Sequence, residues 1–133
     1  MSAPIITFED IEAVLAKLDR TRVNPIVPGN CAYTSETDPT HHCIVGQIWY
    51  ELGRHVPGPG APAASVLTVL RARGELDDYA PGVTAALQAM QVEADEAALS
   101  IGVDGTWGAI IDAWPRFKRE ARRAVAFSAP VPS

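Results

Sequence analysis

Both cysteines and two of the three histidines of this 133-residue chain lie between residues 31 and 43. Cys31, His41, His42 and Cys43 are residue types that bind zinc through thiolate sulfur and imidazole nitrogen. Structural zinc sites usually combine two separated pairs of ligands, whereas three of these four residues are consecutive. Because adjacent side chains diverge on a helix and alternate on a strand, this spacing does not bring all four to one point. They are candidate metal ligands, but the sequence predicts neither a metal nor another cofactor.

Cys43 is also a candidate nucleophile. A thiol near a helix N-terminus has a lowered pKa, and a neighbouring histidine could act as its base. The two residues after Cys43 are apolar, however, and no glycine-rich loop that could form an oxyanion hole stands beside it. A disulfide to Cys31 would stabilise the fold by about 3 kcal/mol, but a reducing compartment argues against it. The simpler interpretation makes Cys43 a small core residue, with His41 and His42 as polar groups at a helix start.

A basic cluster follows the last tryptophan of the chain. Together with Glu120, its five basic residues give residues 116–123 a charge of +4, whereas the whole chain carries −5 and the remainder therefore −9. Arginine side chains in such a cluster can pair with carboxylates through two hydrogen bonds at once. We expect a partner-binding segment made by Arg116, Phe117, Arg119, Arg122 and Arg123.

The position of this segment depends on Pro115, which should break the preceding helix. Its apolar stripe is short, so residues 116–127 are expected to project from the domain or to cover another chain. On this interpretation the segment serves self-association or docking on an acidic protein, and deletion of residues 116–133 leaves the core folded. The alternative is a solvated helix face that pairs with the acidic body of the same protein. The net negative charge argues against nucleic acid as the partner.

Residues 43–52 predict a helix with little polar surface, which is typical of a helix buried on most sides. Asp38 followed by Pro39, or else Thr40, is expected to cap its start, and Gly53 to end it. Gly46 in its interior costs about 1 kcal/mol relative to alanine. We therefore expect another stretch of backbone to approach the helix closely at Gly46.

The other segments predict helices packed around this central one. Thr7 with Asp10 resembles a capping box, and the apolar spacing after it indicates a helix to about residue 20. Further helices are predicted over residues 61–73, 83–99, 106–114 and 116–127, with one helical turn within 75–82 and a short β-hairpin before the central helix. Residues expected to be among the most buried are Leu15, Leu18, Trp49, Trp107 and Ile111.

Composition agrees with one globular domain. Apolar residues make up 47% and charged residues 20% of the chain, which is ordinary for a globular protein. The sequence predicts an all-α domain of five to six helices over residues 1–127 and a disordered tail over residues 128–133. No apolar run approaches the ~18 residues that span a bilayer, and no signal peptide is evident. We expect a soluble cytoplasmic protein without a membrane partner.

Two sequence patterns show a family resemblance. Cys31-x-Tyr33, followed by Cys43-Ile44-Val45-Gly46 and by Leu52-Gly53, is similar to a pattern in small uncharacterised proteins of actinobacteria and their bacteriophages. In those proteins a helix with Gln and Asp follows, and then a Trp-Gly pair; Gln91, Asp95 and Trp107-Gly108 occupy these places here. The resemblance implies an intracellular setting and a phage-encoded accessory protein that acts on a host protein. It implies no activity, because none is assigned to these proteins.

The sequence therefore favours a non-catalytic protein-interaction module of unknown biochemical function, whose partner is another protein or a second copy. The alternative is a Cys/His-based enzyme or a small zinc-binding domain. What argues against the enzyme is the lack of a convergent set of polar groups that could activate a nucleophile.

Overall fold

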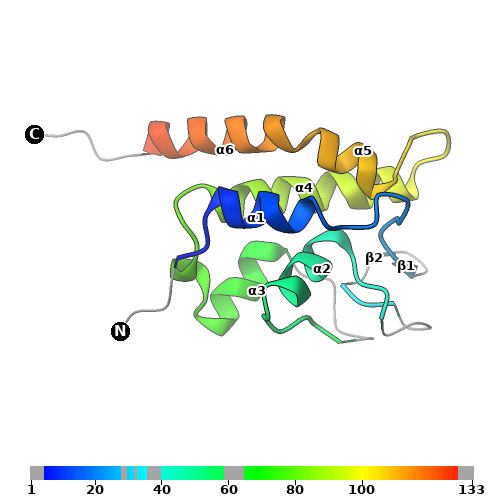
Figure 1. Ribbon diagram of the computed structural model, residues 1–133, viewed down its shortest axis with the longest axis horizontal. Coiled ribbons are helices and arrows are strands. Elements are labelled where there is room, and N and C mark those ends of the chain that lie inside the picture. The colour runs from blue at the N-terminus through cyan, green and yellow to red at the C-terminus, as the bar shows by residue number, and fades with distance from the viewer. Residues whose placement is uncertain (1–4, 28–29, 32, 36–39, 59–64, 129–133) are drawn as a thin grey trace, which may run out of the picture.

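A computed structural model describes residues 5–27, 30–31, 33–35, 40–58 and 65–128. This part of the chain is mostly helical and forms a compact all-α arrangement with one small hairpin (Figure 1). Its elements are α1 (Phe8–Leu15), β1 (Ile26–Val27), β2 (Asn30–Cys31), α2 (Ile44–Glu51), α3 (Val66–Arg73), a 3₁₀ turn (Leu76–Asp78), α4 (Val83–Leu99), α5 (Trp107–Asp112) and α6 (Trp114–Ser128).

Helix α1 begins as predicted and ends earlier. Thr7 and Asp10 form the expected capping box, in which each side chain bonds the backbone N–H of the other residue. The helix ends at Leu15 instead of near residue 20. The physical reason lies at Asp19, whose carboxylate accepts hydrogen bonds from the backbone N–H and the hydroxyl of Thr21 at 3.0 and 2.6 Å. Such local side-chain bonds stabilise a turn at the expense of helix.

Helix α2 starts later than predicted. Its N-cap is Cys43, so the expectation of a cap at Thr40 is wrong, while Asp38 and Pro39 lie outside the described residues. The predicted close approach at Gly46 is confirmed, because a Cβ there would lie 3.0 Å from the carbonyl oxygen of Tyr33. Gly53 adopts the left-handed conformation expected after the helix, with φ of 73°.

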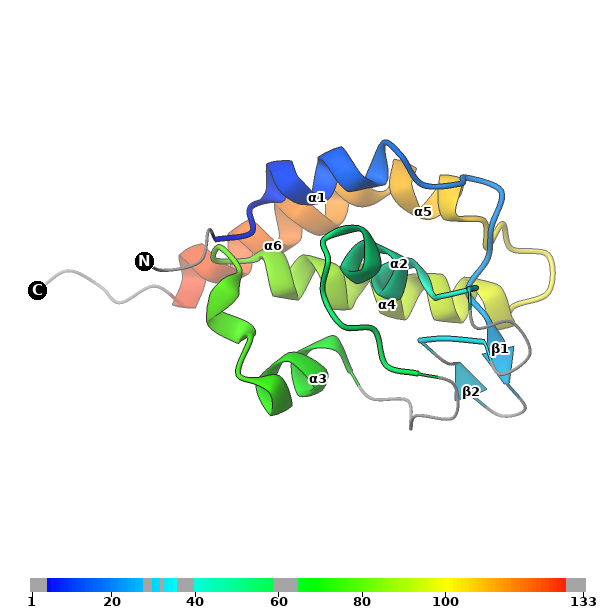
Figure 2. The same cartoon turned by 60° about the horizontal axis from the view of Figure 1, so that its bottom comes forward.

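The core forms around two helices. Five of the eight residues of α2 are buried, and α2 packs against both α1 and α4 (Figure 2). Helix α4, the longest, also packs against α3, α5 and α6. Its predicted bounds are confirmed, and its buried side includes the small residues Ala86, Ala94 and Ala97. Small side chains on this face let the neighbouring helices approach closely.

The expectation that residues 116–127 project from the domain is wrong. Helix α6 lies along α4 (Figure 1), and Trp114, Phe117 and Ala121 on its inner side are all buried. The break between α5 and α6 falls at Ala113, and Pro115 stands in the first turn of α6, where a missing N–H is tolerated. Helix α6 runs to Ser128, and residues 129–133 of the expected tail lie outside the described residues.

The predictions of the hairpin and of most core residues are confirmed, whereas the prediction for Ile111 is not. The short hairpin is present, with Ile26 paired to Cys31 and Val27 to Asn30. Helix α3 begins after its N-cap Ser65, and the earlier residues predicted for it fall outside the described part. Four of the five residues expected in the core are buried, namely Leu15, Leu18, Trp49 and Trp107. Ile111 is only half-buried, because the buried position on α5 is taken by the preceding Ile110.

Candidate functional site

The structure separates the candidate ligands of the Cys/His segment. The Nε2 of His41 lies 2.8 Å from the carbonyl oxygen of Val23, and the Nδ1 of His42 lies 2.9 Å from the hydroxyl of Thr34. Among the described residues, no group of three or more His, Cys, Asp or Glu side chains is placed to hold a metal ion. The side chain of Cys31 lies outside the described part. His41 and His42 therefore form hydrogen bonds with neighbouring protein groups.

Cys43 is a free thiol with no exposed surface. Burial raises its pKa to about 12, although its Sγ accepts a hydrogen bond from the N–H of Gly46 at 3.3 Å. The expectation of a lowered pKa at the helix N-terminus is therefore wrong, because desolvation outweighs the helix dipole. The folded chain favours the neutral thiol. Its contribution to stability is complete below the ordinary thiol pKa and is lost as the pH rises toward about 12.

We predict that Cys43 is inert toward thiol reagents in the folded protein. In a Cys31→Ser variant Cys43 is the only thiol, so its labelling can be followed directly. At about pH 8 the raised pKa alone should slow labelling by about a thousandfold relative to the denatured chain, and burial should slow it further. The measurement compares labelling by an aromatic disulfide with and without denaturant. Rapid labelling of the native variant would restore the thiol-enzyme hypothesis.

A buried polar network surrounds the start of α2 and centres on Asn24, which is 1% exposed. The Oδ1 of Asn24 accepts hydrogen bonds from the N–H of Ile44 at 2.8 Å and from the indole N–H of Trp107 at 3.0 Å. Its Nδ2 donates to the carboxylate of Asp95 at 2.7 Å. One carboxamide thus joins the α1–β1 connection, α2, α4 and α5.

Gln91 lies on α4, one turn before Asp95, and it likewise joins Asp95 to the start of α2. Its Nε2 donates to both carboxylate oxygens of Asp95 at 3.1 Å, and its Oε1 accepts from the N–H of Val45 at 3.4 Å. The carboxylate of Asp95 therefore orients two amides whose oxygens face the positive end of the α2 dipole. With Cys43 bonding Gly46, the unpaired N–H groups in the first turn of α2 are satisfied by side chains.

Sequence analysis placed three residues of this network in a common pattern and missed the fourth. Gln91, Asp95 and Trp107 belong to the resemblance described above, whereas Asn24, which precedes Pro25, is not part of that pattern. A single asparagine before proline carries no local signal of burial. Its role depends on contacts with residues 44, 95 and 107, which are far from it in the sequence.

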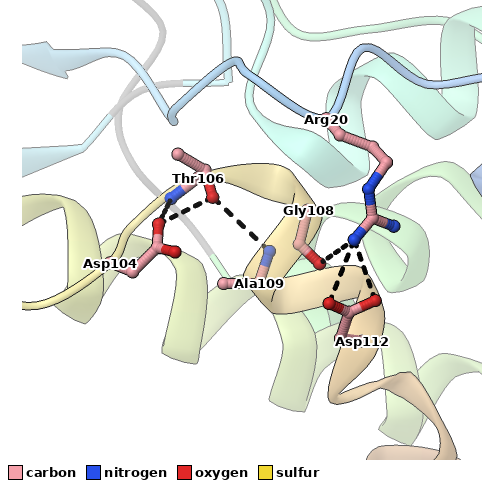
Figure 3. Close-up of polar contacts among 6 residues, drawn as sticks. All are labelled: Arg20, Asp104, Thr106, Gly108, Ala109 and Asp112. Atoms are coloured by element: carbon pink, nitrogen blue, oxygen red, sulfur yellow. Dashed lines mark hydrogen bonds and ion pairs between the residues drawn. The ribbon is translucent and has the colours of Figure 1, made fainter.

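A second set of contacts holds the first turns of α5 (Figure 3). The guanidinium of Arg20 donates to the carbonyl oxygen of Gly108 at 3.2 Å and to the carboxylate of Asp112 at 2.9 and 3.0 Å. Next to it, the carboxylate of Asp104 accepts from the N–H and hydroxyl of Thr106, the N-cap of α5. The side chains of Arg20 and Asp112 are largely exposed, so their ion pair contributes at most about 1 kcal/mol. They orient α5 relative to the segment that follows α1.

The basic residues of α6, together with Phe117, divide into an inner group that contacts the protein itself and an outer group that is exposed. Arg116 pairs with Glu93 of α4 at 2.6 Å. Lys118, on the side toward α1, pairs with Glu12 at 2.8 Å, and this hydrogen bond is the main cause that lowers the pKa of Glu12. Phe117 is 2% exposed, so it belongs to the core and is not available to a partner. These residues fit the alternative in which the basic helix pairs with the protein's own acidic body.

The outer group is exposed, and the charge of Arg122 contributes to the lowered pKa of Glu12. Arg119, Arg122 and Arg123 are exposed, and none forms a salt bridge within the described part of the chain. Arg122 lies over the ring of Phe8 at 5.0 Å from its centre, which holds the guanidinium in place without neutralising it. Because α6 is seated on α4, these arginines stand on a rigid surface. We call Arg119, Arg122 and Arg123 the arginine face.

Comparisons with known proteins add no relative to this description. No family model matches the chain, and neither a curated protein nor a solved structure matches it. Among the described residues, no helix combines the length and the apolar character that a membrane crossing requires. The fold and the contacts above are therefore the basis for any functional conclusion.

Proposed function

We propose that this protein is a non-catalytic protein-interaction module whose arginine face binds an acidic protein surface. The observation that carries the proposal is the division of the basic helix. Arg116 and Lys118 are paired within the chain, whereas the arginine face is exposed without ion-pair partners in the described part. Packing of α6 on α4 fixes the backbone that carries these arginines, and their planar guanidinium groups suit bidentate pairing with carboxylates.

The chemistry of the remaining polar residues supports a non-catalytic role. The one cysteine with a described side chain is buried with a raised pKa, and His41 and His42 bond the carbonyl oxygen of Val23 and the hydroxyl of Thr34. The buried polar network around Asn24 caps α2 from inside the protein. Catalysis needs an accessible nucleophile or base with groups that converge on a substrate. Each of these residues instead contributes to positioning the helices.

We predict that reversing the charge of the arginine face abolishes binding to acidic polypeptide. The probe is fluorescent poly-glutamate, titrated at low salt with wild type, with the double variant Arg119→Glu/Arg123→Glu, and with Arg71→Glu as a matched control. Arg71 is an exposed arginine on α3, away from the arginine face. We expect wild type and Arg71→Glu to bind alike and the double variant to bind at least about tenfold more weakly.

Parallel titrations with duplex DNA and with a source-cell lysate test the class of partner. A protein retained from lysate by wild type and Arg71→Glu, but lost with the double variant, would support the proposal. Equal binding of poly-glutamate by all three proteins would contradict it. Binding to DNA in preference to poly-glutamate would also contradict it, because the partner would then be nucleic acid.

A further inference from the structure

The surface next to the arginine face is hollowed and acidic. A hollow of about 450 Å³ lies between α4 and α6, and a second of about 290 Å³ continues it toward the start of α5. Because the two hollows share Glu93 and Glu96, they form one groove along α4, which we call the acidic groove. Its charged lining residues are Glu93, Glu96, Asp104, Arg116 and Glu120. Four carboxylates and one guanidinium give the groove a formal net charge of −3.

Most of these carboxylates have no cation beside them. Glu93 pairs with Arg116, and Asp104 accepts hydrogen bonds from the N-cap residue of α5. Glu96 and Glu120 are exposed, and neither forms a salt bridge with a residue that the structure describes. The three guanidinium groups of the arginine face likewise have no salt bridge in the described part. The chain therefore carries three excess negative charges beside three unpaired positive ones.

The two surfaces are neighbours but face different directions. Helix α6 packs on α4 through the buried Phe117 and Ala121, so the arginine face points away from α4. The groove runs along the contact between these two helices, which lie side by side along the molecule (Figure 1). Glu120 stands on α6 where the two surfaces meet. A two-fold axis through this border brings the arginine face of each copy onto the acidic groove of the other.

We propose that the arginine face of one copy binds the acidic groove of a second copy, and the reverse, in an isologous dimer. This inference rests on the proposed function, since it keeps the arginine face as the binding surface and names the acidic surface that it meets. Val92 and Val103 line the groove and are 43% and 55% exposed, so the contact also covers apolar surface. Because exposed charges dominate it, we expect roughly micromolar or weaker affinity, which falls as salt is added.

The test is sedimentation equilibrium of the full chain over a wide range of concentration, at low and at high salt. Arg119→Glu/Arg123→Glu reverses the arginine face, and Glu96→Arg/Glu120→Arg reverses the groove, all at exposed positions. Each double variant should associate about a hundredfold more weakly than wild type, because like charges then oppose each other. The matched control is Arg71→Glu, which lies on α3 outside both surfaces and should associate like wild type.

Combining the two reversals in one chain gives the decisive result. The quadruple variant has an acidic face and a basic groove, so the two surfaces are again complementary with their signs exchanged. The reversals cancel, and this variant keeps the wild-type net charge of −5. Its association should return to within about tenfold of wild type. An equimolar mixture of the two double variants should form a one-to-one dimer for the same reason, and circular dichroism checks that each variant is folded.

Three results would each overturn the inference. They are a wild type that stays monomeric, double variants that associate like wild type, and a folded quadruple variant or a mixture that stays monomeric. The poly-glutamate titration, made at a concentration where wild type is monomeric, tests the proposed function separately. A wild type that binds poly-glutamate through the arginine face but does not self-associate would retain the proposed function and overturn only the dimer.

Discussion

Replacing Asn24 by alanine should destabilise the protein by about 3–4 kcal/mol, a large share of the 5–15 kcal/mol that a domain usually has. The change removes one acceptor and one donor, yet leaves three groups behind without their partner. These are the buried N–H of Ile44, the buried indole N–H of Trp107 and the carboxylate of Asp95. The measurement is urea unfolding followed by circular dichroism, compared with wild type.

Two further variants separate this network from the general effect of losing an amide. Gln47→Ala removes a carboxamide from the outer side of α2, where its bond to Glu51 is exposed, and should change stability by no more than about 0.5 kcal/mol. Asn24→Asp keeps both acceptor bonds but brings a second carboxylate against Asp95. The stability that Asn24→Asp loses relative to wild type should become smaller as the pH falls, because one of the two carboxylates takes up a proton. Equal small losses in Asn24→Ala and Gln47→Ala would show that the network does not stabilise α2.

Replacing Phe117 by alanine should cost about 3–5 kcal/mol, the range for a buried phenylalanine. Its side chain is 2% exposed, and it lies on the side of α6 that packs on α4, between the buried residues Trp114 and Ala121. For the same reason, removal of residues 116–133 should unfold the domain instead of leaving the core intact. Chemical denaturation of both variants measures these effects.

Arg119→Ala is the matched control for Phe117, because it lies two positions along the same helix with its side chain exposed. We expect it to change stability by no more than about 0.5 kcal/mol. Phe117→Leu should lose less stability than Phe117→Ala and more than Arg119→Ala, because leucine keeps part of the buried volume. If Phe117→Ala unfolds at the same urea concentration as wild type, α6 is not part of the core and the expectation of a projecting segment returns.

Local signals in the sequence predicted the features that depend on local contacts. The capping box of Thr7 with Asp10 and the left-handed turn at Gly53 each involve residues within one helical turn. The bounds of α4 follow from apolar residues that recur at helical spacing over a long stretch without proline. The requirement for close backbone approach at Gly46 could also be inferred, because a glycine inside a helix needs compensation.

Features that depend on distant contacts could not be predicted. Several residues before α2 have N-cap propensity, but tertiary hydrogen bonds at Cys43 and the residues after it decide where the helix begins. The pKa of Cys43 depends on burial, which its sequence neighbours do not reveal. For α6, the short stripe around Phe117 appeared too weak to hold the helix, because the contribution of small residues such as Ala121 depends on the alanine-rich surface of α4.

The capping of α2 from distant segments has a consequence for the order in which the chain folds. The first N–H groups of α2 are satisfied by Asn24, which precedes the helix, and by Gln91, which is made long after it. Asn24 in turn is held by Asp95 and Trp107. During synthesis, the side-chain caps of α2 are therefore incomplete until α4 and α5 have followed. Contacts of such sequence separation slow folding and couple the helices, so the domain should gain its structure in one late cooperative step.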